Sequence, residues 1–144
     1  MLYISHRGYI EGPDKKLENN PENLSYLISK NIHIEVDVRY HRKNFYLGHD
    51  EPKYRIDKKF LEQSNLWCHA KDTETLDEIR NLKCHYFWHQ NDDYTLTSKG
   101  YIWVYPGKTL IKNCIAVLPE NHDQDLSNCY GICTDNIKNY LKNL

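Results

Sequence analysis

Strand-like runs separated by helical patterns occupy the first half of the chain, and this alternation limits the fold more than any other feature. The strand-like runs span Leu2–His6, Ile32–Tyr40, Leu66–Lys71 and His85–His89. The helical patterns between them span residues 19–30, 56–64 and 72–82. Parallel strands need long crossover connections, usually helices, so this order predicts a parallel sheet with helices between its strands.

The second half of the chain is rich in strand-like runs and has little room for helices. Its runs span Tyr101–Tyr105, Cys114–Leu118 and Tyr130–Thr134, and a short run at Phe45–Leu47 adds to those of the first half. The closing residues 135–144 carry apolar side chains at helical spacing and predict a last helix. There is no internal repeat and no long linker, so a single domain over residues 1–144 is expected.

Together these runs predict an α/β fold, namely a compact (β/α) barrel of reduced size whose later helices are shortened to loops. The length of 144 residues works against this prediction, because an eight-fold barrel usually needs about 250 residues. An open α/β sheet is the alternative architecture.

Composition argues against several classes of function. The formal net charge is −1 and no basic block occurs, so no nucleic-acid partner is expected. No apolar run approaches the roughly 20 residues of a transmembrane helix, and the first residues are typical of a strand and not of a secretion signal. The five cysteines form no CxxC pair, which favours free thiols in a reducing compartment. A cytoplasmic protein is therefore expected, and its oligomeric state is left open.

The run HIEVDVRY, residues 33–40, places two carboxylates on one face of a strand. Successive side chains of a strand point to opposite faces, so Glu35 and Asp37 point the same way. Carboxylates this close repel each other unless a cation lies between them, and oxygen ligands suit Mg²⁺ or Ca²⁺. The solvated face of an edge strand is the alternative for these two residues taken alone.

Other polar side chains fall near the carboxyl ends of the predicted strands, where β/α barrels carry their chemistry. His6 and Arg7 end the first run, and His49 follows in the segment LGHDEP. On the third run, His69 and Lys71 share a parity and are expected to point toward the two carboxylates.

Each of these residues has an ordinary structural alternative, such as a turn residue for His49 or a surface residue for His69. Taken together, two imidazoles can act as acid and base near neutral pH, and an Arg and a Lys can hold an anion. With a divalent cation, this set suits a phosphate ester better than an acyl or glycosidic bond. The histidines without such partners are expected to be structural: His33, His41, His85, His89 and His122.

Four motifs occur in a characteristic order. They are SHRG at residues 5–8, NNPENLSYLI at 19–28, IEVDV at 34–38 and LGHDEP at 47–52. In order and separation they resemble the glycerophosphodiester phosphodiesterase family, which shares its barrel plan with the phosphatidylinositol-specific phospholipase C superfamily. The late YGICTD, residues 130–135, resembles the closing strand of that family, whereas residues 84–128 match poorly. The resemblance implies a TIM-type barrel and metal-dependent cleavage of a small-molecule phosphodiester.

The resemblance also implies roles for the matching residues. His6 and His49 would be the catalytic acid–base pair, and Glu35 and Asp37 would bind the divalent cation, Mg²⁺ or Ca²⁺. The residues that would bind the substrate or build its site are Arg7, Lys71, Glu22 and Asn23, with Asp135 supporting the rim. Trp103 lies in a segment similar to the Trp-bearing penultimate region of the family; it could stack on a sugar or base, with core packing as the alternative.

Position 69 departs from the family pattern. Members usually carry Glu-x-Lys on the third strand, with the Glu as third metal ligand, and here the residues are His69, Ala70 and Lys71. An imidazole can still bind a metal, and it favours Mn²⁺ or Zn²⁺ over Ca²⁺. It also makes the site less negative by one charge, so a lower metal affinity is expected. Three hypotheses stay open: a metal-dependent phosphodiester hydrolase, a relative that binds a phosphorylated ligand without cleaving it, and a phosphodiesterase for sugar-nucleotide-type substrates.

Overall fold

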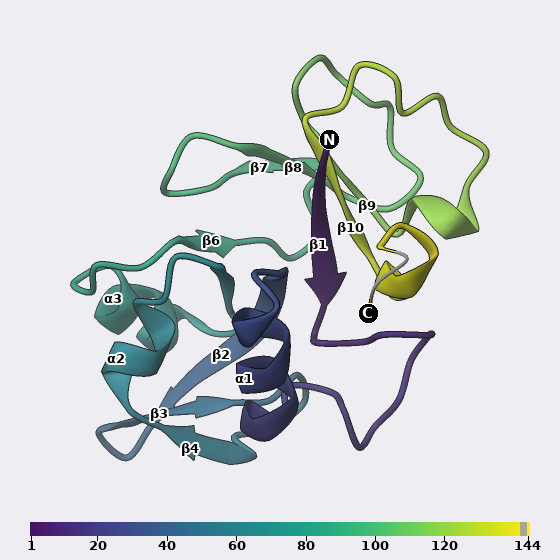
Figure 1. Cartoon of the computed structure of the whole chain (residues 1–144). Coiled ribbons are helices and arrows are strands. Elements are labelled where there is room, and N and C mark those ends of the chain that lie inside the picture. Colours follow the sequence, from purple (N-terminus) through teal and green to yellow (C-terminus); the bar gives the residue numbers. More distant parts are fainter. Residues whose placement is uncertain (142–143) are drawn as a thin grey trace.

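The computed structural model describes residues 1–141 and 144, and strands dominate its backbone (Figure 1). The strands are β1 (Leu2–His6), β2 (His33–His41), β3 (Asn44–Leu47), β4 (Tyr54–Ile56), β5 (Leu66–Ala70), β6 (Tyr86–Trp88), β7 (Tyr94–Leu96), β8 (Ile102–Val104), β9 (Ile115–Val117) and β10 (Gly131–Thr134). The helices are α1 (Pro21–Ser29), α2 (Lys58–Leu61) and α3 (Thr73–Ile79), with the 3-10 turns η1 (Pro119–Asn121) and η2 (Ile137–Asn139).

Parallel pairing runs through the centre of one continuous sheet. Hydrogen-bonded neighbours follow the order β6-β5-β2-β1-β10-β9-β8, and each of these pairs is parallel. Antiparallel hairpins extend the sheet, because β3 and β4 pair beyond β2 and β7 pairs with β8. The long strand β2 connects these parts: its first residues pair with β1, its last residues pair with β3, and β5 pairs along its other edge.

The prediction of a reduced TIM-type (β/α) barrel was wrong. Among the described residues, strands account for 30% and helices for 18%, and the sheet curls into half a barrel. Within the described residues no hydrogen-bonded ladder joins β6 to β7 or β8, so the curl stays open at this edge. The later strands have only three or four residues each. Short strands joined by loops leave too little chain to close a barrel with eight helical crossovers.

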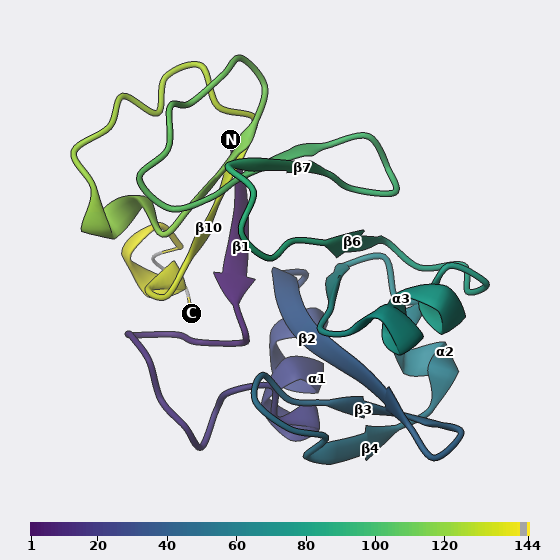
Figure 2. The ribbon, with the colours of Figure 1, turned by 180° about the vertical axis from the view of Figure 1, so that it is seen from behind.

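The individual elements also include more strand and less helix than expected. The strand–helix–strand order is confirmed for β1-α1-β2 and β5-α3-β6, whereas β4 and β7 were not predicted. In place of the expected closing helix over residues 135–144, the structure has the short turn η2, and residues 142–143 of that segment lie outside the described part. Figures 1 and 2 show the helices α1, α2 and α3 gathered around β2 and β3, while loops connect the strands on the other side of β1.

Helix α1 begins where its sequence predicts. The Asn20 side chain accepts a hydrogen bond from the Glu22 backbone N–H, and Pro21 occupies the first turn, where its missing N–H costs nothing. The helix buries Leu24 and Leu27 completely. This packing holds α1 against β2 and keeps the loop that follows β1 beneath the start of the helix.

Two apolar clusters lie on opposite faces of the sheet. The cluster on the helix side includes Ile34, Val36 and Val38 of β2. The cluster on the concave side is built mainly by Trp67, Phe87 and Trp103, with Ile4, Ile115, Val117 and Cys133. The alternation predicted for β2 and β5 is therefore confirmed, and the polar side chains of these strands lie on the concave face above the aromatic cluster.

A methyl group at Gly131 would test the central strand pairing. Gly131 lies opposite Leu2 in the β1–β10 ladder, and an added Cβ would lie 2.7 Å from the Leu2 carbonyl oxygen. Gly131→Ala should therefore lower the free energy of unfolding by about 1–3 kcal/mol, measured by urea denaturation. Lys112→Ala, at an exposed position, is the control; equal stability of the two variants would contradict this account.

Candidate active site

The predicted carboxylate pair lies on the concave face of the sheet and is withdrawn from solvent. Glu35 and Asp37 of β2 are 2% and 0% exposed. Two adjacent buried carboxylates cost several kcal/mol unless positive charge or hydrogen bonds compensate them. Their surroundings must therefore supply cations.

His69 completes a group of three side chains that could share an ion. It lies opposite Asp37 in the register of β2 and β5. Its Nδ1 atom is 3.4 Å from Glu35 Oε1 and 3.7 Å from Asp37 Oδ1. One ligand atom of each residue lies within 4.8 Å of the others, and among the described residues this is the group with metal-ligand geometry.

Several segments contribute partners to Asp37. Arg7 Nε lies 3.1 Å from Asp37 Oδ2, and Lys71 Nζ lies 3.4 Å from Asp37 Oδ1. Asn19 donates a hydrogen bond to Asp37 Oδ2 and accepts one from the Asp37 backbone N–H, at 2.9 and 3.0 Å. Burial would raise the pKa of Asp37, but the charges of Arg7 and Lys71 outweigh it and hold the pKa below its ordinary value.

The donor set fits a divalent cation. Asp37 Oδ1 is buried and has no hydrogen-bond partner, whereas Asp37 Oδ2 accepts a hydrogen bond from Asn19. His69 Nε2 is 2.8 Å from the backbone carbonyl oxygen of His89, so this nitrogen carries the proton and donates it. The Nδ1 lone pair of a neutral His69 then faces the carboxylates. Lys71 Nζ lies 3.4 Å from Asp37 Oδ1 but makes no hydrogen bond to it. An oxygen without a hydrogen bond and a nitrogen lone pair that face one another are ligands that a cation can bind.

His6 forms a carboxylate–imidazole pair beside this cluster. His6 Nδ1 lies 2.5 Å from Asp135 Oδ1, and His6 Nε2 lies 3.8 Å from Glu35 Oε2. Burial alone would lower the pKa of His6, but the hydrogen bond to Asp135 and the charge of Glu35 outweigh it and raise the pKa above 6.5. Asp135 is held in turn, because its backbone N–H donates to Glu120 Oε1 at 2.7 Å.

The turn after β1 directs Arg7 toward the carboxylates. Arg7 has a φ of +54°, in the left-handed region, and its backbone N–H donates to the Glu35 carbonyl oxygen at 2.9 Å. Gly8 follows with a φ of +83°, and an added Cβ would meet Asn23 and Leu24 of α1 at 2.8 Å. The HRG segment is therefore shaped by close packing under α1 as well as by the chemistry of its side chains.

A cavity of about 280 Å³ opens over these groups. The structure brings most of the predicted site residues together on its walls: His6, Arg7, Glu35, His49, His69, Lys71 and Trp103. His49 is partly exposed and pairs with Asp50 at 2.7 Å. Trp103 is 4% exposed and packs on Phe87 at a ring-centroid distance of 4.7 Å, so it belongs to both the aromatic core and the cavity wall.

Two of the predicted substrate-binding residues lie outside the cavity. Glu22 is exposed on the first turn of α1 and is absent from the cavity lining. The Asn23 side chain donates to the Gly8 carbonyl oxygen at 2.8 Å and thereby supports the turn after β1. Asn23 therefore contributes to the site through the backbone that carries Arg7.

Sequence reasoning missed several residues that shape the site. Asn19, which holds Asp37, precedes the PEN motif and carries no pattern of its own. Glu18 accepts a hydrogen bond from Tyr9 and lies 3.6 Å from Arg7 Nη1. His89 was expected to be structural, but it borders the cavity, and its carbonyl oxygen, which orients His69, has no residue-type signal in the sequence.

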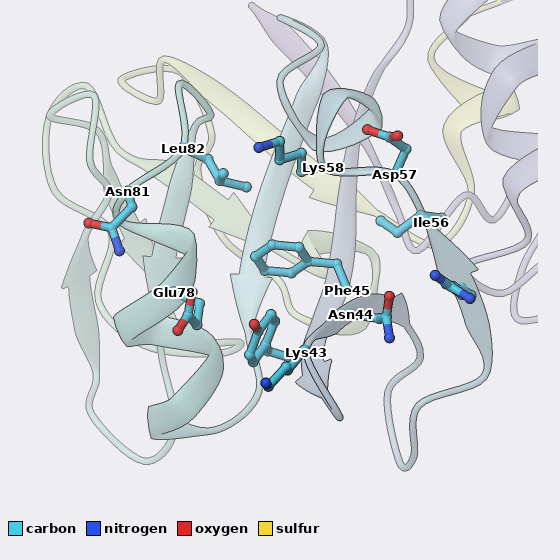
Figure 3. Close-up of a pocket in the computed structure, with 11 residues that line it drawn as sticks. Lys43, Asn44, Phe45, Ile56, Asp57, Lys58, Glu78, Asn81 and Leu82 are labelled. Atoms are coloured by element: carbon cyan, nitrogen blue, oxygen red, sulfur yellow. The ribbon is translucent and has the colours of Figure 1, made fainter.

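A larger open groove of about 790 Å³ lies between the β3–β4 hairpin and α3. Figure 3 shows Phe45 at its centre, with Lys43, Asp57 and Lys58 around it. The ionisable side chains labelled there lie apart from one another around Phe45 and do not converge on a common point. The smaller cavity over Glu35 is therefore the better candidate for chemistry.

Comparison of the chain with protein-family models, with curated proteins and with solved structures finds no match. Among the described residues no helix has the length and apolar character needed to cross a membrane.

The His6–Asp135 pair gives a direct test by titration. Asp135→Asn should lower the pKa of His6, measured by NMR of its ring in metal-free protein, with Asp123→Asn as an exposed control. Because the folded-state pKa lies above 6.5, protonation of His6 adds stability that is fully present below pH 6.5 and is lost as the pH rises through the folded-state pKa. An unchanged His6 titration in Asp135→Asn would exclude this pairing.

Proposed function

We propose that the chain is a metal-dependent phosphodiester hydrolase that acts on a small glycerophosphodiester-like molecule or lipid headgroup. The observation that supports this most strongly is the convergence on one cavity of a carboxylate–imidazole metal cluster, two further histidines and two cationic side chains. A phosphodiester needs each part of this set: charge neutralisation, a proton acceptor and a proton donor.

In this proposal Arg7 and Lys71 hold the phosphate. Both line the cavity and both contact Asp37, which fixes their charged ends next to the metal cluster. When bound to Glu35, Asp37 and His69, a divalent cation would act as a Lewis acid on a phosphate oxygen. The two fixed cations stabilise the negative charge that develops at phosphorus.

His6 transfers protons through one defined atom. Asp135 occupies Nδ1, so Nε2 is the atom that takes or gives a proton, and the carboxylate stabilises the imidazolium that forms. His49 serves as the second member of the acid–base pair from the loop after β3. One of the two histidines deprotonates the nucleophile, and the other protonates the leaving alkoxide. The nucleophile is water or a neighbouring hydroxyl of the substrate, and the latter gives a cyclic phosphate first.

The size of the cavity favours a small substrate. Its volume of about 280 Å³ lies at the lower limit of ligand pockets in proteins, roughly 300–1,000 Å³. It suits a phosphate with a glycerol-sized group better than a sugar nucleotide. A reducing, cytoplasmic setting is part of the proposal and is supported by the free thiols at Cys68, Cys84, Cys114, Cys129 and Cys133.

The proposal is tested by ³¹P NMR with purified protein and a panel of glycerophosphodiesters, lipid headgroup esters and sugar nucleotides, each with Mg²⁺, Ca²⁺ and Mn²⁺. His6→Ala and His49→Ala should each reduce turnover by about 10²–10⁴-fold, because each removes a proton-transfer group. Glu35→Ala should abolish the metal-dependent turnover, because it removes a proposed ligand of the ion. His41→Ala, at an exposed histidine outside the cavity, is the matched control.

Turnover retained by both the His6 and the His49 variants would exclude the acid–base mechanism. Absence of turnover, with wild-type protein still binding phosphate esters, would favour the non-catalytic ligand-binding alternative. Turnover of sugar nucleotides alone would assign the other substrate class.

A further inference from the structure

We propose that the ion held by Glu35, Asp37 and His69 belongs to the Mn²⁺ and Zn²⁺ class and that Mg²⁺ and Ca²⁺ bind this site weakly. This inference rests on the metal site of the proposed function. It replaces the preference for Mg²⁺ or Ca²⁺ that the carboxylates alone suggest, and it depends on how the structure orients one imidazole ring.

The ring of His69 is held from several directions. Its Nε2 atom lies 2.8 Å from the His89 carbonyl oxygen. One face of the ring stacks on Phe87, with centroids 4.8 Å apart and planes inclined by 17°. The side chain of His69 is 17% exposed. Because β5 and β6 are in register at His69 and Phe87, the strand pairing itself brings both of these partners into place.

This orientation decides which nitrogen faces the carboxylates. A carbonyl oxygen only accepts hydrogen bonds, so the proton of a neutral His69 resides on Nε2. The lone pair of Nδ1 is then directed to the space shared by Glu35 Oε1 and Asp37 Oδ1, at 3.4 and 3.7 Å. Three electron-rich atoms facing one another repel, and of the two carboxylates Lys71 Nζ contacts only Asp37, at 3.4 Å from Oδ1. A cation between the three atoms removes the repulsion that is left. A His whose second nitrogen is fixed by a carbonyl is the usual arrangement of a metal-ligating imidazole.

A second proton on His69 would not satisfy this site as well as an ion does. A protonated Nδ1 has one hydrogen to donate, whereas two carboxylates border it. Asp37 Oδ1 is buried and makes no hydrogen bond, and no hydrogen bond joins Nδ1 to either carboxylate within the described residues. An ion with several open coordination positions contacts all three ligands at once.

The identity of the third ligand selects the class of ion. Mg²⁺ and Ca²⁺ are hard cations that bind through oxygen and rely on negative charge. Imidazole nitrogen suits Zn²⁺ and other first-row ions, and Mn²⁺ accepts both oxygen and nitrogen. A neutral imidazole in place of a carboxylate therefore removes one charge that the hard ions need and supplies a nitrogen that the other ions prefer. Arg7 and Lys71, both close to Asp37, repel every divalent ion to the same extent, so the choice among ions depends on the His69 nitrogen.

Isothermal titration calorimetry of metal-free protein tests the inference without measuring activity. Mn²⁺, Mg²⁺ and Ca²⁺ are titrated into wild-type protein and into the variants His69→Glu and His69→Gln. The wild type should bind Mn²⁺ more tightly than Mg²⁺ and Ca²⁺. His69→Glu should reduce the Mn²⁺-to-Mg²⁺ affinity ratio by roughly 10–100-fold, the range in which changes around a ligating group alter metal affinity. His69→Gln should weaken Mn²⁺ binding without strengthening Mg²⁺ binding.

Two controls separate this site from adventitious binding. His41→Gln, at an exposed histidine on β2, should leave Mn²⁺ affinity unchanged. Zn²⁺ is titrated on the Cys129→Ser background, because the thiols of Cys114 and Cys129 lie 3.7 Å apart and offer it another place to bind. Circular dichroism confirms that each variant is folded.

The possible results distinguish failure of the inference from failure of the proposed function. Mg²⁺ or Ca²⁺ binding at least as tightly as Mn²⁺, with no change of ratio in His69→Glu, would overturn the inference and leave a metal-dependent hydrolase in place. Absence of binding by every ion at millimolar concentration would overturn both the inference and the metal site on which the proposed function depends.

Discussion

The buried carboxylate of Asp37 is the constraint on which the rest of the site depends. Removing one partner from a buried ion pair typically costs about 3–5 kcal/mol, because the remaining charge is left uncompensated. Asp37 is fully buried and receives Arg7 from the turn after β1, Asn19 from the loop before α1 and Lys71 from the end of β5. The charge of Asp37 therefore holds three separate segments of the chain together at the site.

These segments belong to the part of the sheet with the most complete pairing. Strands β10, β1, β2 and β5 form parallel ladders of three to five residue pairs. His6, His69 and Asp135 lie at or near the carboxyl ends of their strands, whereas Glu35 and Asp37 lie further back in the longer strand β2. The opposite half of the curl, with β8 and β9, mainly supplies wall residues such as Trp103 and Val117. Such a site needs neighbouring parallel strands but not a closed barrel. An open, curled sheet can therefore still form the cavity.

The faces of the long strands could be predicted from the sequence, whereas the closure of the sheet could not. The alternation in HIEVDVRY and LWCHAK identified the inward faces of β2 and β5, because a period of two leaves no choice once one face is apolar. The closure of the sheet could not be predicted in this way, since it depends on how strands of three residues fit together. The strands β4 and β7 were missed because they lack the longer apolar runs that surround the equally short β6, β8 and β9. Asn19 and the His89 carbonyl were missed for a different reason: their roles depend on where a loop and a strand end meet in space, which residue type does not encode.

The charges around Asp37 also connect the departure at position 69 with the proposed substrate. Glu35 and Asp37 carry two negative charges and Arg7 and Lys71 two positive ones, so these four side chains are electrically balanced before any ion binds. A divalent ion then leaves the site positive, and a phosphodiester carries a single negative charge. A glutamate at position 69 would cancel part of that positive charge, whereas His69 does not. In the proposed site, a neutral imidazole at position 69 offers a nitrogen to the ion and also leaves the cavity more attractive to an anionic ester than a glutamate would, because charges act strongly in a site largely closed to water.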